Sequence, residues 1–249
     1  MKSLIVGNWK LYVPTLQGAK KLFRDIDKSF PRGVKSTVVV CPPTPFVALM
    51  RDEYGGKKLS FGAQDAFYEV DGAHTGMTSP RALRSADIEY VILGHAEVRA
   101  QGETSETVSK KVVLALEEKL HPIICLGESV RDSEGLYLSE IERMVSETLS
   151  RVESSNASKI TIAYEPVWAI GGAAAPEPRT ASETMMFIRK TLADMWGREK
   201  ALKVRIIYGG AVDTENAERF KECEGIQGLL VGRASTDAKE FVQIIKAWS

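Results

Sequence analysis

Four side chains of the kinds that move protons or stabilise negative charge follow short apolar runs of this 249-residue chain. Asn8 and Lys10 follow the first such run, His95 follows a second and Glu165 a third. A carboxylate can take a proton from the carbon beside a carbonyl group if imidazole and ammonium groups stabilise the oxyanion that develops. These residue types are therefore the set that enolisation next to a carbonyl requires.

Glycines follow two further apolar runs. Gly209 and Gly210 come directly after residues 204–208, and Gly232 comes after residues 228–231. Because glycine has no Cβ, backbone N–H groups at such turns can approach an anion closely. We interpret the two turns as a phosphate site, and the alternative that these glycines only turn tight corners stays open.

Each of the four polar residues also has a structural interpretation when it is taken alone. A glutamate at a strand end is more often a cap or an ion-pair partner than a catalyst. His95 alone fits a hydrogen-bonded structural imidazole, Lys10 a solvated surface cation, and Asn8 the start of a turn. The functional hypothesis therefore depends on these side chains meeting at one place.

The elements that would position them are short β-branched runs that alternate with longer amphipathic stretches. This alternation predicts βαβ units around a parallel sheet, and the strands are too apolar to have a wet face. The predicted strands are residues 4–7, 37–41, 59–63, 90–93, 122–126, 160–164, 204–208 and 228–231. The predicted helices include residues 16–29, 106–120, 137–152, 181–196 and 238–248.

Eight such units in about 250 residues favour a single (β/α)8 TIM barrel, in which residues 1–249 form one catalytic domain, over an open doubly wound sheet. The nucleotide-binding patterns GxGxxG and GxxxxGK[ST] are both missing, which disfavours the open sheet further. In a barrel the loops after the strands meet at one mouth. The fold prediction thus brings the candidate residues together.

The balance of charge and the cysteines narrow the class of partner and the compartment. Lys plus Arg and Asp plus Glu number 33 each, so no net charge favours nucleic acid or a membrane as partner, and a small ligand fits better. Three cysteines with no CxxC pair fit a reducing compartment. Residues 1–13 lack a signal-peptide pattern, and no apolar run approaches 18 residues. We therefore predict a cytoplasmic location.

Several segments resemble the triosephosphate isomerase family. They are residues 7–10 (GNWK), 93–95 (LGH), 163–171 (AYEPVWAIG) and 208–210 (YGG). The similarity runs from end to end and includes residues 62–65, 72–76, 125–128 and 230–232, in the family's order. Residues 163–171 are the most specific of these segments.

The resemblance implies an aldose–ketose isomerase of glycolysis and gluconeogenesis, which interconverts dihydroxyacetone phosphate and D-glyceraldehyde 3-phosphate through an enediolate without a metal or cofactor. It implies that Glu165 is the base and that His95 donates to the oxyanion. Lys10 would supply positive charge, Asn8 would orient the substrate oxygens, and Glu97 would order Lys10.

The resemblance also implies a phosphate site, a lid and a homodimer. The phosphate site would use Gly171, Ala211, Gly232 and Arg233. The lid and its hinges would use Pro166, Val167, Trp168, Ala169, Ile170, Gly172 and Tyr208. In a C2 homodimer, Thr75 in the loop of residues 72–76 would approach the partner's active site, whereas the alternative for this stretch is a plain surface loop.

The chain departs from the family around the phosphate site. The lid tip reads GGAAAPE at residues 171–177, two residues and a lysine fewer than the family's usual GTGKTATPE. Ala211 stands where a serine usually holds the closed lid, so that state is predicted to lose a side-chain hydrogen bond of about 0.5–1.5 kcal/mol. Arg233 replaces a glycine. Either its backbone has φ below zero and its side chain adds charge near the anion, or the backbone at this residue is strained.

Two rival functions stay open at this point. A shorter lid fits a barrel isomerase that acts on a larger phosphorylated substrate. A non-catalytic barrel kept for binding or assembly is the other class, although such a protein need not keep Asn8, Lys10, His95 and Glu165 together.

Overall fold

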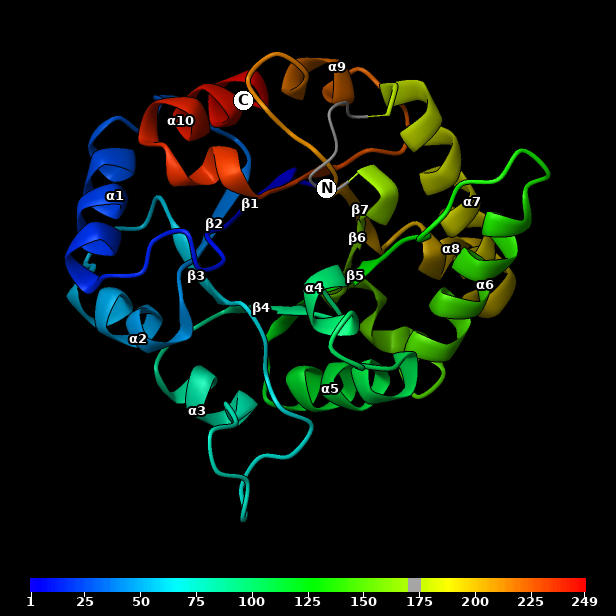
Figure 1. Ribbon diagram of the computed structural model, residues 1–249, viewed down its shortest axis with the longest axis horizontal. Helices are drawn as coiled ribbons and strands as arrows, with labels where there is room; N and C mark the ends of the chain where they lie inside the picture. Colours follow the sequence, from blue (N-terminus) through cyan, green and yellow to red (C-terminus); the bar gives the residue numbers. More distant parts are fainter. Residues whose placement is uncertain (170–175) are drawn as a thin grey trace.

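The strands of this chain pair into a closed parallel barrel (Figure 1). The computed structural model describes residues 1–169 and 176–249. Each strand pairs with the next one along the chain, and the last strand pairs with the first. The (β/α)8 barrel prediction is therefore confirmed. The strands are β1 (Leu4–Asn8), β2 (Thr37–Cys41), β3 (Ser60–Ala63), β4 (Tyr90–Leu93), β5 (His121–Leu126), β6 (Thr161–Tyr164), β7 (Arg205–Tyr208) and β8 (Gly228–Val231).

Helices surround the barrel and cover its outer surface (Figure 1). The α-helices are α1 (Leu16–Lys28), α2 (Thr44–Glu53), α3 (Pro80–Ser85), α4 (Ala96–Arg99), α5 (Ser105–Glu117), α6 (Leu136–Leu149), α7 (Pro178–Trp196), α8 (Arg198–Ala201), α9 (Ala217–Lys221) and α10 (Ala238–Ala247). The 3-10 helices of the described residues are η1 (Ser154–Lys159), η2 (Val167–Ala169) and η3 (Arg233–Thr236). Among the described residues, no helix is long and apolar enough to cross a membrane.

Successive residues of most strands belong to two separate apolar cores. In β1, Leu4 and Val6 belong to one cluster and Ile5 to another. The smaller cluster also contains alternate residues of the other strands, such as Val39, Ile123 and Leu230, because successive side chains of a strand point to opposite faces. Strands buried on both faces explain why the predicted runs are apolar almost throughout.

Side-chain caps fix where several of the outer helices begin. The Thr15 hydroxyl accepts from the backbone N–H of Gly18 (3.2 Å) at the start of α1, and the Thr104 hydroxyl accepts from that of Thr107 (3.2 Å) at the start of α5. At the start of α10 the Asp237 carboxylate accepts two amide N–H groups, and its negative charge also suits the positive end of the helix. Such caps set the ends of the helices that lie between successive strands.

One loop extends away from the barrel between β3 and α3 (Figure 1). Its outermost part contains Thr75, which is exposed, and Met77, which is 57% exposed. The imidazole Nε2 of His74 lies 2.8 Å from a carboxylate oxygen of Glu69 and braces the loop internally. Thr75 therefore lies outside the mouth of its own barrel.

Closure of the barrel requires a close backbone approach of β1 and β8 at Gly228. Gly228 is in register with Leu4 and has a φ of 155°, which side chains of L residues rarely adopt. A Cβ at position 228 would lie 2.0 Å from the carbonyl oxygen of Leu4. That contact involves backbone on both sides, so it is relieved only if the two strands separate.

Replacing Gly228 with Ala is expected to lower the free energy of unfolding by about 3 kcal/mol, because the added methyl group forces the closing strands apart. Gly55→Ala is the matched control, since its Cβ would meet no heavy atom within 4 Å. Denaturant-induced unfolding of both variants measures the difference. Equal unfolding midpoints for the two variants would show that closure does not depend on this contact.

Candidate active site

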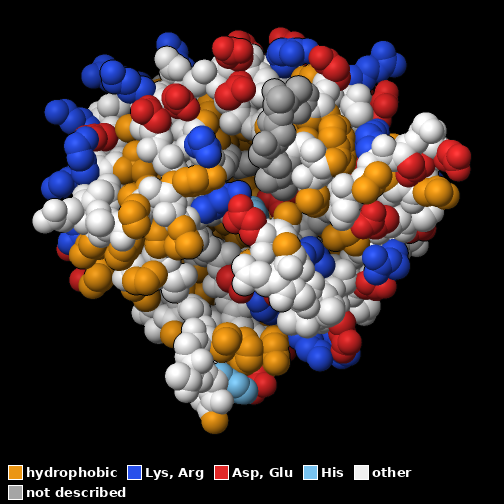
Figure 2. Space-filling view, in the orientation of Figure 1, with side chains coloured by type: hydrophobic (Ala, Val, Ile, Leu, Met, Phe, Trp, Pro, Cys, Tyr) orange, Lys and Arg blue, Asp and Glu red, His pale blue; other side chains and the backbone are white. Residues whose placement is uncertain are grey.

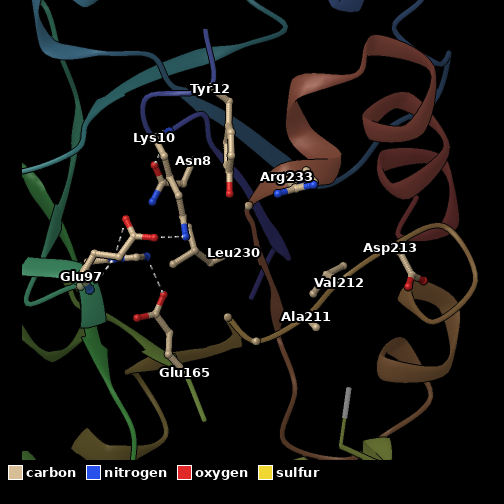
Figure 3. A pocket seen from close by; sticks show the side chains of 14 residues that line it. Asn8, Lys10, Tyr12, Glu97, Glu165, Ala211, Val212, Asp213, Leu230 and Arg233 are labelled. Atoms are coloured by element: carbon tan, nitrogen blue, oxygen red, sulfur yellow. Dashed lines mark hydrogen bonds and ion pairs between the residues drawn. The ribbon is translucent and has the colours of Figure 1, made fainter. Parts of the chain in front are cut away.

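The candidate residues line a cavity of about 620 Å³ at the carboxyl ends of the strands (Figure 3). Basic and acidic side chains gather near the centre of the face of the barrel on which this cavity opens (Figure 2). The lining comes from strands that are far apart in the sequence: Asn8, Lys10, Tyr12, His95, Glu97, Glu165, Gly209, Gly210, Ala211, Val212, Asp213, Leu230, Gly232 and Arg233. The convergence on which the sequence hypothesis depended is thus present in the structure.

Lys10 has a left-handed backbone conformation that hydrogen bonds hold in place. Its φ is 47°, an uncommon value for a residue with a side chain. Its backbone N–H donates to Oδ1 of Asn8 (3.1 Å), and Nε2 of Gln64 donates to its carbonyl oxygen (3.0 Å). The same Nε2 also donates to the carbonyl oxygen of Cys41 (3.0 Å), which fastens the turn to β2. Backbone strain of this kind persists only where surrounding contacts enforce it.

The Lys10 ammonium group is directed across the cavity by Glu97. Nζ of Lys10 lies 2.6 Å from Oε1 of Glu97, and the two side chains are 17% and 55% exposed. Figure 3 shows this pair above Glu165, on one side of the cavity. The expected proximity of Glu97 to Lys10 is therefore present.

His95 lies immediately before α4, and its hydrogen bond to the first turn of that helix sets its tautomer. Nδ1 accepts the backbone N–H of Glu97 (3.2 Å), so in the neutral ring the proton is on Nε2. Nε2 lies 3.3 Å from Oε1 of Glu165 and points into the cavity. The ring is 5% exposed. The geometry directs the Nε2 edge of the imidazole at a carboxylate.

Arg99 supports the turn that carries His95. Its guanidinium group donates to the carbonyl oxygen of Gly94 (2.8 Å), to the hydroxyl of Ser105 (3.2 Å) and to the carbonyl oxygen of Cys125 (3.4 Å). These bonds connect the end of β4 to α5 and β5. The position of the imidazole is therefore fixed from outside the cavity.

Glu165 follows β6 and is 2% exposed. Its backbone N–H donates to the carbonyl oxygen of Leu126 (2.8 Å), and its Oε2 accepts the backbone N–H of Ala96 (3.3 Å). Burial raises the pKa of this carboxyl group, and the attraction of His95 and the Ala96 N–H bond offset part of that effect. A carboxylate with a raised pKa is a stronger base than an exposed one.

The absence of a side chain at Gly209 leaves room for this carboxylate. A Cβ at that position would lie 2.8 Å from Cγ of Glu165. The glycine after β7 therefore has a steric role in the candidate base, besides the role in anion binding that the sequence suggested.

The segment after Glu165 is anchored to the buried carboxylate of Glu128. Oε1 of Glu128 accepts the Tyr164 hydroxyl (2.9 Å) and the Trp168 indole N–H (2.8 Å). The carbonyl oxygen of Glu128 accepts the backbone N–H of Val167 (3.0 Å). The carbonyl oxygen of Pro166 accepts the backbone N–H of Ala169 (2.9 Å). These contacts hold η2, the expected first hinge. The predicted lid residues Ile170, Gly171 and Gly172 lie outside the described residues.

The far wall of the cavity carries amides without an acceptor. The backbone N–H groups of Gly210, Ala211, Gly232 and Arg233 make no hydrogen bond within residues 1–169 and 176–249. Gly210 is buried, Ala211 and Gly232 are half-buried, and Arg233 is exposed. An N–H group that is shielded from water requires an acceptor. Arg233 does not have a positive φ, so of the two possibilities for this residue, backbone strain is wrong.

Tyr208, which was predicted among the lid and hinge residues, lies behind this wall and not in it. Its ring is fully buried and stacks on Phe220 with a centroid distance of 4.1 Å. Thr75 also lies away from the cavity, on the extended loop. The remaining predicted residues of the described chain either line the cavity or, as with η2, form the segment that leaves it.

Sequence reasoning missed the parts of the lining that have no motif. Tyr12, Val212, Asp213 and Leu230 line the cavity, and Gln64 holds the Lys10 turn. Tyr12 and Asp213 each lie within a few residues of a predicted site residue. Their closeness in the sequence to those residues was the signal that could have identified them. Gln64 lies in the segment 62–65 that resembles the family, but this similarity gave it no role, since that role depends on the contact of β1, β2 and β3.

The fold and this set of side chains define an isomerase of the (β/α)8-barrel class. The family model described as triosephosphate isomerase matches residues 3–248. A relative of that name from Carboxydothermus hydrogenoformans is 40% identical over 247 residues, and one from Moorella thermoacetica is 41% identical over 246 residues. Each alignment covers 98% of both chains. The chain belongs to the triosephosphate isomerase family.

The buried carboxyl group leads to a prediction about stability. A carboxyl group whose pKa is higher in the folded state than in the unfolded state contributes most to stability at a pH below its unfolded pKa. This contribution is lost as the pH rises through the pKa of the folded state. Glu165→Gln cannot ionise, so the variant is expected to gain stability relative to the unmodified protein as the pH rises from 4 to 9. Urea unfolding across that range measures the difference.

Glu142→Gln is the control for this experiment, because Glu142 is exposed on α6 and has little burial to relieve. A stability difference for Glu165→Gln that stays constant across the pH range, as expected for the control, would contradict the raised pKa.

Proposed function

We propose that this chain interconverts dihydroxyacetone phosphate and D-glyceraldehyde 3-phosphate, as a step of glycolysis and gluconeogenesis. The observation that carries the proposal is the 3.3 Å approach of the Glu165 carboxylate to Nε2 of His95, two buried groups that line one cavity. Membership of the triosephosphate isomerase family supports the same reaction. Triose phosphates are small enough to lie within the 620 Å³ cavity.

In the proposed reaction Glu165 takes the proton from C1 of dihydroxyacetone phosphate, and the carbonyl oxygen at C2 gains negative charge. The Nε2–H group of His95 donates to that oxygen, while the Lys10 ammonium group stabilises the charge. The hydroxyl proton moves from the C1 oxygen to the C2 oxygen through the imidazole. The protonated Glu165 then returns its proton to C2, which gives the aldehyde and regenerates the carboxylate.

The remaining site residues bind and orient substrate. Asn8 fixes the Lys10 turn and presents its amide at the cavity, and Glu97 directs the ammonium group. The unpaired backbone amides of Ala211, Gly232 and Arg233 are suited to the phosphate oxygens. The predicted contribution of Gly171 to this site remains a prediction.

We also propose a homodimer in the cytoplasm. The extended loop with Thr75 has the shape and exposure of a segment that docks into a second copy of the chain, and its apolar Met77 would be covered there. Cys41, Cys125 and Cys223 are all free, as is usual in a reducing compartment.

The proposed reaction is tested with purified protein and D-glyceraldehyde 3-phosphate. Conversion to dihydroxyacetone phosphate is expected, with a kcat/KM for the triose phosphate that exceeds the value for longer sugar phosphates. A higher kcat/KM for a longer sugar phosphate would assign the barrel to another isomerisation. If the protein turns over neither substrate, the hypothesis of a non-catalytic binding protein would be favoured.

Glu165→Gln is expected to lower kcat by about a thousandfold or more, because the amide cannot accept the C1 proton. His95→Gln is expected to lower kcat by about a hundredfold or more through the lost donor to the oxyanion. Steady-state kinetics measures both effects, with Glu142→Gln as the exposed control. Near-normal kcat in Glu165→Gln would reject this residue as the base.

A further inference from the structure

The cavity wall contains a cationic side chain that the reaction above does not use. Arg233 is the first residue of η3, directly after β8, and it lines the cavity together with Tyr12. Its Cζ lies 5.3 Å from the centroid of the Tyr12 ring. Figure 3 shows both side chains across the cavity from Glu165. Arg233 thus lies beside the unpaired amides of the far wall, across the cavity from Glu165.

The charge of Arg233 is not neutralised by its neighbours. Within residues 1–169 and 176–249, no carboxylate oxygen lies within 4.0 Å of its guanidinium group, whereas Lys10, the other cation of the lining, is paired with Glu97. The nearby Asp213 carboxylate accepts the backbone N–H groups of Glu215 and Asn216, both at 2.9 Å. Within the described residues, the Arg233 guanidinium group is therefore left without an ion-pair partner, although the Asp213 carboxylate lines the same cavity.

Tyr12 restricts where the guanidinium group can go. A cation over an aromatic face is attracted by the ring, and a flat guanidinium group can stack there while its N–H groups stay free. Tyr12 is half-exposed, and it extends from the same loop as Lys10. The loop after β1 and the turn after β8 therefore place one cation each on the cavity wall.

We propose that the Arg233 side chain, held on Tyr12, binds the phosphate group of the substrate. The proposal rests on the proposed function and adds a side-chain contact to the backbone amides. A guanidinium group donates two parallel hydrogen bonds to phosphate oxygens. Arg233 and Tyr12 are thus residues that determine affinity for the phosphate group, and they take no part in the proton transfer.

Arg233→Gln is expected to raise KM for the triose phosphate and the inhibition constant of inorganic phosphate by about tenfold each, with a smaller effect on kcat. Arg233→Lys keeps the charge but not the paired donors, so it should recover part of the loss. Tyr12→Leu removes the aromatic face and is expected to weaken phosphate binding by about threefold. Arg84→Gln, an exposed arginine on α3, is the matched control and should change neither constant.

Two further measurements separate this proposal from its alternatives. Titration calorimetry with inorganic phosphate tests binding without turnover, so it remains decisive even if the triose phosphate reaction is not the right one. Circular dichroism of each variant shows whether the fold is retained. A folded Arg233→Gln variant that binds phosphate as tightly as the unmodified protein would overturn the role of Arg233, and an unchanged Tyr12→Leu variant would overturn that of Tyr12.

Discussion

The site depends on keeping a carboxylate out of water and within reach of an imidazole. Burial raises the pKa of Glu165, which makes the group more basic but also costly to ionise. The neighbouring Nε2 of His95 and the N–H of Ala96 reduce that cost without making the carboxylate fully satisfied. Most other contacts of the site, including the Arg99 bonds behind His95 and the space beside Gly209, serve to keep these two groups in place.

A second consequence concerns how charge is distributed along the cavity. Lys10 is positioned by a strained backbone and by Glu97, whereas Arg233 is positioned by an aromatic ring. The first arrangement gives a cation with a carboxylate partner near the candidate base. The second gives a guanidinium group that has no ion-pair partner among the described residues, at the turn where we propose that the phosphate group binds.

The sequence predicted the barrel and most of the site, for physical reasons that differ between the two. The strands 37–41, 90–93 and 228–231 were predicted to the residue, because runs buried on both faces leave a continuous apolar signal. The short helices α4, α8 and α9 have too few turns for a periodic pattern, so periodicity did not identify them. Gln64 and the Glu128 anchor of η2 were not predicted in their roles, since each depends on contacts between strands that lie apart in the sequence. The stacking of Arg233 on Tyr12 is of the same kind.

The pairing of the first strand with the last has a consequence for how the chain acquires its structure. Leu4 emerges early in translation, but its partner Gly228 emerges only near the end. Until then one edge of β1 has unpaired backbone groups, and such an edge can pair with other strands. Loop-closure entropy also makes a contact between such distant residues slow to form. The growing polypeptide thus carries an incomplete ring, with an aggregation-prone rim, for almost the whole of its synthesis.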